Sequence, residues 1–207
     1  LELPASLHGL VLARLDRLPA EQQGLLKAAS IIGREFTVAE LHGYCPTLGT
    51  AGSVAAHLDE LARLGHAPAL PDAAEPTHVF GHLVTLEASY ESIAHETRAR
   101  LHGQYARYLE GRAPDGPPPA LAPLLAHHYG RAGCAAEACR YQRLAGEQAA
   151  ARYANVEALA HFERALQGLA ADDLDGRWDV LTRRVALHDL LGRRDAQRHD
   201  LEAIERL

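Results

Sequence analysis

Histidines are the residues of this chain whose type and spacing could do chemistry. His78 and His82 lie four residues apart, with Glu87 close by. On a helix this spacing would put two imidazoles on one face, where they could hold a zinc ion. The residues around His78 predict a strand instead, and positions four apart along a strand are separated by roughly 13 Å. We therefore expect no metal site here.

The sequence shows no recognisable motif of a catalytic nucleophile. The chain contains no GxSxG motif, and Cys45 precedes Pro46 with nothing beside it that would activate a thiol. The phosphate-binding loops GxxxxGK[ST] and GxGxxG are missing as well. We expect no catalytic residue, no enzymatic activity and no bound cofactor in this chain.

Composition sets the class of protein. The 207 residues carry a net charge of −6, with 47% hydrophobic and 23% charged residues, as in an ordinary globular protein. The acidic balance argues against a nucleic-acid partner, and no apolar run has membrane-spanning length. Three cysteines without a CxxC pair predict free thiols in the cytoplasm. The start at LELP, without Met, suggests a fragment of a longer protein.

The first half of the chain predicts helices followed by one hairpin. Helical periodicity and stop signals favour helices at about 4–18, 20–32, 37–44 and 53–64. Two short extended pieces, about 67–70 and 77–81, flank the turn-rich PDAAEP and predict a β-hairpin. This order of helices and hairpin is typical of a winged-helix domain. His82 would lie where the second strand runs into the next helix.

The second half predicts a helical array. After a helix at about 96–111, the proline-rich APDGPPPA marks a linker. Small residues recur with one bulky residue per helix, as in Ala158, Phe162 and Ala165, which favours stacked helix pairs. The predicted fold is therefore mostly α: a winged-helix-like domain with one β-hairpin at 1–112, a linker at 113–119, and a TPR-like helical array at 120–207. Helices of this array are expected at about 120–131, 134–152, 155–170, 177–191 and 195–206.

Several stretches, in this order, resemble bacterial STAND ATPases. LPASLHGLVLARLDRLPAEQQGLLKAASIIGREF (3–36) is similar to the segment that follows the nucleotide-binding core of these large signalling ATPases. Some members are fused to class III adenylate cyclases or to LuxR-type transcriptional regulators. FGHLVTLEASYES (80–92) resembles their F-x-H-x-L-x-x-E-x-x-Y element. AHHYGRAG and AGEQAAARYANVEALAHFERAL resemble the start of their helical repeats.

The resemblance implies a non-catalytic regulatory and protein-interaction segment, because the nucleotide-binding core itself is missing. ATP or ADP is implied only for the full-length protein. The implied partners are the upstream nucleotide-binding domain of the same chain and a protein partner or effector on the helical repeats. In related ATPases of the NOD-like-receptor type, the winged-helix domain supplies a His that contacts the β-phosphate of ADP. The resemblance puts His82 in that role; the alternative is that its ring caps a carbonyl or packs on Tyr90.

Two other functions remain open. One is a DNA-binding winged-helix transcriptional regulator, although Asp59 and Glu60 in the third helix, and Asp72 and Glu75 at the hairpin tip, would repel phosphates. The other is a plain helical-repeat adaptor. The array offers cationic and aromatic groups of the kind enriched at interfaces: Arg140, Tyr141, Arg143, Arg152 and Tyr153.

Overall fold

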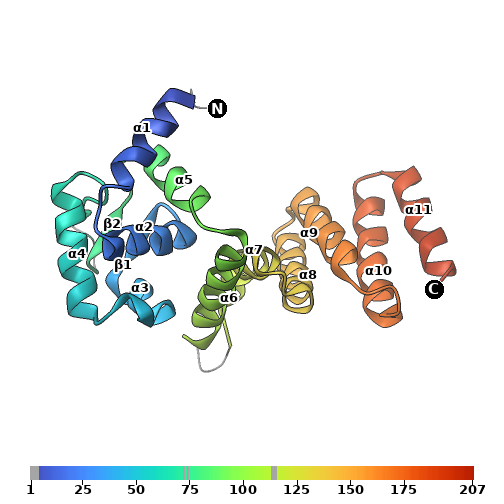
Figure 1. The fold of residues 1–207 in the computed structure, drawn as a ribbon. Coiled ribbons are helices and arrows are strands. Elements are labelled where there is room, and N and C mark those ends of the chain that lie inside the picture. The colour runs from blue at the N-terminus through green and yellow to red at the C-terminus, as the bar shows by residue number, and fades with distance from the viewer. Residues whose placement is uncertain (1–4, 72, 74, 113–115) are drawn as a thin grey trace. The chain divides into compact units, whose positions relative to one another are not determined.

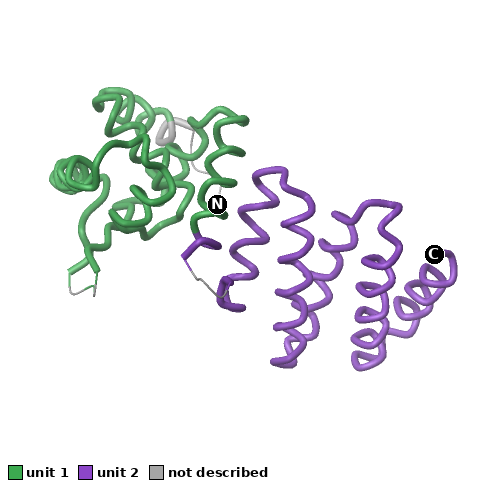
Figure 2. The backbone as a smooth tube through the Cα atoms, turned by 90° about the horizontal axis from the view of Figure 1, so that it is seen from below, with its two compact units in different colours: residues 1–108 green, residues 109–207 purple. Residues whose placement is uncertain are grey.

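A computed structural model describes residues 5–71, 73, 75–112 and 116–207, with side chains from residue 9 onward. The chain is mostly helical, as predicted. It divides into two compact units, which we call unit 1 (residues 1–108) and unit 2 (residues 109–207) (Figure 2). The division falls inside the helix that precedes the predicted linker. That linker, 113–119, lies partly outside the described residues.

Unit 1 has the helix order that the sequence predicts. Helix α3 begins at Thr37, as expected: its hydroxyl accepts from the Glu40 N–H at 3.1 Å, and the Glu40 carboxylate accepts from the Thr37 N–H at 3.0 Å. Helix α4 begins earlier than expected, because Thr50 rather than Ser53 is the cap. The helices are α1 (Ala5–Leu15), α2 (Ala20–Ile32), α3 (Val38–Tyr44), α4 (Ala51–Arg63), α5 (Leu83–Glu91) and α6 (His95–Gly111), with a 3-10 turn η1 (Pro46–Leu48).

The small sheet differs from the predicted hairpin. Strand β2 (Thr77–Val79) pairs antiparallel with β1 (Glu35–Thr37), with Phe36 opposite His78. The predicted first strand, 67–70, forms only an isolated bridge to β2, through Leu70 N–H to Thr77 O at 2.8 Å and Val79 N–H to Pro68 O at 2.9 Å. Pro68 has no N–H with which to continue a ladder. The three residues of β1 are too few to show an alternating pattern, which is why the sequence did not predict that strand.

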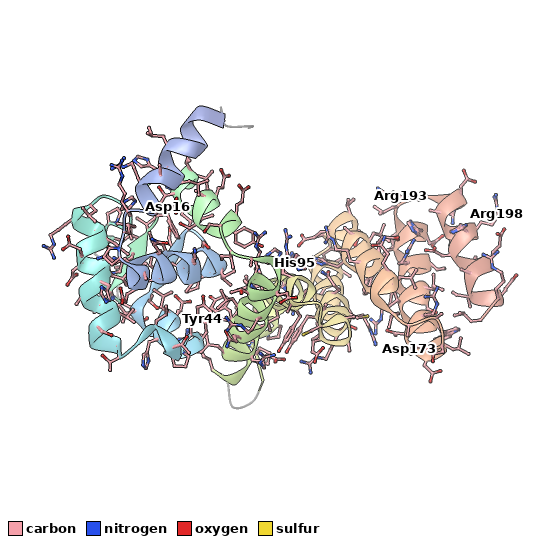
Figure 3. The ribbon with its side chains drawn as sticks, viewed as in Figure 1. Asp16, Tyr44, His95, Asp173, Arg193 and Arg198 are labelled. Carbon is pink, nitrogen blue, oxygen red and sulfur yellow. The ribbon has the colours of Figure 1, made fainter. Side chains whose placement is uncertain are left out.

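Buried aromatic residues pack in the core of unit 1. Phe36 and Phe80 meet edge to face, with ring centroids 5.4 Å apart. Tyr44 of α3 is buried, and its hydroxyl donates to Ala28 O of α2 at 2.6 Å (Figure 3). Tyr105 of α6 packs edge to face on Tyr44 at 5.2 Å. The Tyr44–Tyr105 contact places α6 against α3.

Unit 2 is a succession of antiparallel helices in which each packs on the next (Figure 1). A 3-10 turn, η2 (Pro119–Leu121), precedes the first helix. Asp173 begins the fourth, since its carboxylate accepts from the Gly176 N–H at 2.9 Å (Figure 3). The sequence predicted that helix to begin a few residues later. The helices are α7 (Ala122–Ala132), α8 (Ala135–Ala151), α9 (Asn155–Gly168), α10 (Leu174–Leu190) and α11 (Arg194–Glu205).

The predicted spacing of small and bulky residues in α9 is confirmed. Phe162 is buried, and Ala158 and Ala165 are fully enclosed beside it. Phe162 lies against the backbone of Gly146 in α8, where an added Cβ would come within 2.8 Å of its ring. Gly146 is therefore required by the close crossing of the two helices.

A buried ionic cluster holds α11 to its neighbours. The Asp200 side chain is 2% exposed, and its carboxylate accepts from Arg184 Nε of α10 at 3.0 Å. Arg184 also pairs with Glu163 of α9. His188 Nε2 lies 3.5 Å from the same Asp200 oxygen without forming a hydrogen bond. This cluster gives a short amphipathic helix a specific docking position.

Candidate functional site

The segment that leads to His82 is fixed on both sides. Phe80 is buried, and Gly81 lies so close to the preceding turn that an added Cβ would be 2.3 Å from Gly65 O. The Gly81 N–H donates to His66 O at 3.0 Å. His82 then occupies the N-cap position of α5, with φ −139° and ψ 140°, and its side chain makes no capping hydrogen bond. The backbone of His82 is held in place while its ring remains exposed.

His82 lines a cavity of about 330 Å³ inside unit 1. Residues from α1, from the turn after α4 and from the first turn of α5 form the walls. Among the described residues the lining is mostly apolar, with basic groups added and no carboxylate. The lining residues are Leu10, Val11, Arg14, Leu64, His66, His82, Val84 and Thr85.

His66 is the most enclosed basic group of this cavity. It follows Gly65, whose positive φ of 79° turns the chain after α4, and its N–H donates to Leu61 O at 2.9 Å. The residue is 8% exposed, yet its ring has no hydrogen-bond partner within the described ranges. Burial, together with the positive charges of Arg14 and His82, lowers the pKa of His66 from its ordinary value of 6.5. The ring is therefore mainly neutral at pH 7, although it has room for an acceptor.

Arg14 adds a permanent positive charge to the wall formed by α1. Its side chain is exposed and forms no ion pair with any described residue. Arg14, His66 and His82 thus face one cavity with no acidic residue in the described lining. An arginine and two imidazoles in this arrangement can donate hydrogen bonds to an anion, and protonation of either imidazole adds charge.

The two histidines that the sequence placed four apart do not act together. His78 is buried in β2, and its Nδ1 lies 3.0 Å from Ala67 O. Over the residues for which a structure is given, no group of three His, Cys, Asp or Glu could hold a metal ion. His78 therefore lies on a strand, as the sequence predicted.

The alternative placement of His82 on Tyr90 is also not seen. The Tyr90 hydroxyl lies 3.0 Å from His102 Nε2, and the Arg98 guanidinium stacks 4.4 Å from the Tyr90 ring centroid. Nor does the exposed ring of His82 cap a carbonyl of any described residue. The structure leaves His82 available for a ligand, and it places His66 and Arg14 in the lining of the same cavity. Spacing in the sequence could not reveal those two residues, because three separate elements bring them together.

The residues proposed as an interface in unit 2 are largely paired within the unit. The Glu110 carboxylate accepts from the hydroxyls of Tyr129 and Tyr141 and from Arg140, the last at 2.6 Å. Burial by itself raises the pKa of Glu110, but these hydrogen bonds and the charge of Arg140 outweigh it, so the pKa is lowered overall. Burial, and then the hydrogen bond and negative charge of Glu110, raise the pKa of Tyr141 to about 12, although Arg140 acts against this shift.

Two more of these arginines have partners, whereas one aromatic residue is exposed. Arg143 pairs with Asp179 at 2.7 Å, and Arg152 pairs with Glu157 at 2.6 Å. Tyr153 is 88% exposed, and its φ of 62° lies in the left-handed region that favours glycine or asparagine. Tyr153 is thus the member of the predicted set that is free to contact a partner.

A second cavity, of about 290 Å³, lies on the helical array between α7, α8 and α9. Most of its lining residues are Ala or Gly, whose small size leaves this space between the helices, and Gln142 and Arg164 supply polar groups. The Gln142 Oε1 lies 2.7 Å from His161 Nδ1, which orients the amide. The lining residues are Ala126, Gly130, Gly133, Ala135, Ala138, Cys139, Gln142, Arg164 and Gly168.

Within the described part of the chain, no helix is both long enough and apolar enough to cross a membrane.

Comparison with known proteins adds no further identification. No protein-family model, no curated protein and no solved structure matches this chain.

Proposed function

We propose that this chain is a non-catalytic regulatory and protein-interaction segment of a cytoplasmic STAND-type signalling ATPase. In this role it couples the nucleotide state of an upstream domain to an output through interdomain contacts. The observation that supports the proposal best is the position of His82. It lies at the N-terminus of α5 with an exposed ring that has no hydrogen bond to the described residues.

The proposed mechanism is a hydrogen bond that exists in one nucleotide state only. The imidazole of His82 donates an N–H to a phosphate oxygen of ADP held by the upstream domain. The N-terminal end of α5 adds its partial positive charge. ADP then bridges two domains in the resting state, and loss of that bridge releases them.

The helical array supplies the second half of this function. Stacked helix pairs present an extended surface for a protein partner or effector. The exposed Tyr153 and the second cavity, between α7, α8 and α9, are the surfaces available for this purpose. The proposal assigns partner docking to unit 2 and nucleotide sensing to unit 1.

Direct DNA binding by α4 has less support. Its Arg63 pairs with Glu60 at 2.5 Å, and Asp59 is exposed on the same helix. A helix that entered the major groove would bring these carboxylates toward phosphates, which repel them. No observation on the described residues favours this function over the regulatory one.

The proposal can be tested on the full-length protein. We expect His82→Ala to reduce ADP affinity by about ten- to a hundredfold, because a hydrogen bond to a charged group contributes roughly 1.5–3 kcal/mol. His95→Ala is the matched control, since His95 is an exposed histidine at the start of α6 (Figure 3) that does not line the cavity. ADP retained through gel filtration, measured by chromatography of the released nucleotide, gives the readout. Equal retention by both variants would refute the role of His82.

The family assignment has its own test. The reading frame before Leu1 should encode a GxxxxGK[ST] loop followed by an acidic partner residue. A frame that encodes neither would overturn the assignment to STAND ATPases.

A further inference from the structure

We propose that the cavity lined by Arg14, His66 and His82 is itself a binding site for a small organic anion. The ligand would carry a phosphate or carboxylate group on an apolar body. The site belongs entirely to unit 1 and needs no upstream domain, so this inference goes beyond the nucleotide contact proposed for His82.

The ring of His66 supplies the first observation. The residue is 8% exposed, it lines the cavity, and no hydrogen bond joins its ring to a described residue. The ring nitrogens are not among the buried unpartnered atoms of the described residues, so they remain accessible to water or to a ligand. An acceptor inside the cavity can therefore form a hydrogen bond with this ring.

Charge decides what kind of acceptor fits. Arg14 is unpaired in the described structure and His82 is exposed, and both face the same space as His66. The described lining contains no Asp or Glu. The first-turn N–H groups of α5, a nine-residue helix, add partial positive charge at the same end. An anion is therefore favoured over a neutral or cationic ligand.

The rest of the lining predicts the body of the ligand. Leu10, Val11, Leu64 and Val84 form an apolar wall, and Leu10 and Leu64 are 61% and 45% exposed. The cavity volume of about 330 Å³ lies near the lower limit for small-molecule sites. One aromatic ring or a short aliphatic chain would cover this wall while its anionic group meets the basic side chains.

Binding should depend on pH in a direction that the site determines. Burial and the neighbouring positive charges of Arg14 and His82 keep the pKa of His66 below 6.5 in the free site. A bound anion raises the pKa of His66 because it adds an opposite charge. The complex then takes up protons that the free protein does not hold, so affinity should rise as pH falls from the pKa of His66 in the complex toward its lower pKa in the free site.

Phenyl phosphate is a suitable probe, and its binding to the 207-residue chain can be followed by calorimetry at pH 6 and pH 7.5. We expect saturable binding that is tighter at pH 6. Benzoate in a second arm shows whether carboxylate is accepted, and inorganic phosphate shows whether the apolar wall contributes. Phenol, which lacks the anionic group, should not bind. Absence of saturable binding by both phenyl phosphate and benzoate would overturn the proposal.

Matched variants assign the binding to this cavity. Arg14→Gln should weaken phenyl phosphate binding at least tenfold, whereas Arg17→Gln, an exposed arginine on the turn after α1 that does not line the cavity, should leave it unchanged. His66→Asn should remove the pH dependence of phenyl phosphate binding. If that variant loses its far-UV circular dichroism signal, His82→Asn is measured in its place, because a substitution at the exposed His82 should not disturb the fold. Equal affinities for the two arginine variants would exclude this site.

These results are separable from the nucleotide proposal. Anion binding by the isolated chain, without any effect of His82→Ala on ADP retention by the full-length protein, would support the cavity and refute the ADP contact. The reverse outcome would refute the cavity and keep the ADP contact.

Discussion

The two units treat their charged and polar side chains differently. In unit 2, Glu110 and Asp200 each bring groups from separate helices together, and their partners are other side chains of the same unit. In unit 1, Arg14, His66 and His82 meet at a cavity without pairing to any described residue. Paired charges fix the positions of helices, whereas unpaired ones around a cavity are available for a ligand. The paired groups of unit 2 hold helices together, and the unpaired groups of unit 1 line the proposed binding site.

The largest expected effect comes from breaking the buried ion pair of unit 2. Arg184→Met leaves the Asp200 carboxylate, which is 2% exposed, without its main partner. Loss of one member of a buried pair costs about 3–5 kcal/mol, because the other charge stays desolvated. Urea unfolding followed by circular dichroism measures the loss in the free energy of unfolding.

A control and a rescue sharpen this first test. Arg198→Met removes an exposed arginine whose partner Asp195 is 3.4 Å away, and it should change stability by less than about 0.5 kcal/mol. The double variant Arg184→Met with Asp200→Leu should recover most of the loss. If Arg184→Met is as stable as Arg198→Met, the cluster does not dock α11.

The next effect concerns packing within the array. Ala165 is fully enclosed in the core with Phe162. Ala165→Leu should overpack the core and cost roughly 1–3 kcal/mol. Ala160→Leu, on the exposed side of the same helix, is the control. A melting temperature that is the same for both variants would contradict the buried face assigned to α9.

Elements with strong periodicity were predictable from the sequence, and this explains where prediction succeeded. The helices of unit 2, the Thr37 cap and the burial of Phe162 follow from local spacing and capping chemistry. Strand β1 was missed because its three residues form a strand only through pairing with β2. The ionic cluster at Asp200 and the Tyr contacts of Glu110 depend on which helix faces meet, and spacing within one helix does not determine that.

The candidate site was predictable only in part, for the same reason. His82 stood out because it belongs to a recognisable stretch at a strand-to-helix junction. His66 and Arg14 come from the turn after α4 and from α1, and the fold brings them to His82. Their local sequence shows neither the burial of His66 nor the absence of a carboxylate partner. A site made from three elements becomes visible only when the tertiary structure is known.

A smaller effect is expected from the Glu110 cluster. The pKa of Glu110 is lowered in the folded state, so this group stabilises unit 2 above pH 4.5, and that contribution is lost as pH falls below 4.5 toward the folded-state pKa. Glu110→Gln should cost about 1–3 kcal/mol at pH 7. The difference in unfolding free energy between wild type and variant should shrink between pH 5 and pH 3. A difference that is independent of pH would show that packing, not charge, is what the variant loses.

The smallest expected effect belongs to His188. It tests whether a buried histidine without a hydrogen bond makes the stability of unit 2 depend on pH. His188 is buried, and neither ring nitrogen has a hydrogen bond in the described structure. Burial lowers its pKa from 6.5; Asp200 and Glu163 act against this shift, and Arg184 and Arg193 add to it. The unfolded chain therefore binds a proton more readily than the folded one between 6.5 and the folded-state pKa.

Stability of the wild-type protein should accordingly decline as pH falls through 6.5. His188→Gln has no such proton to bind, so its unfolding free energy should vary less over this range. His199→Gln, an exposed histidine of α11, should keep the wild-type slope. Urea titrations at pH 7.5, 6.5 and 5.5 compare the three proteins. If His188→Gln and His199→Gln show the same slope, the pKa of His188 does not change on folding, and protonation of this histidine does not affect stability.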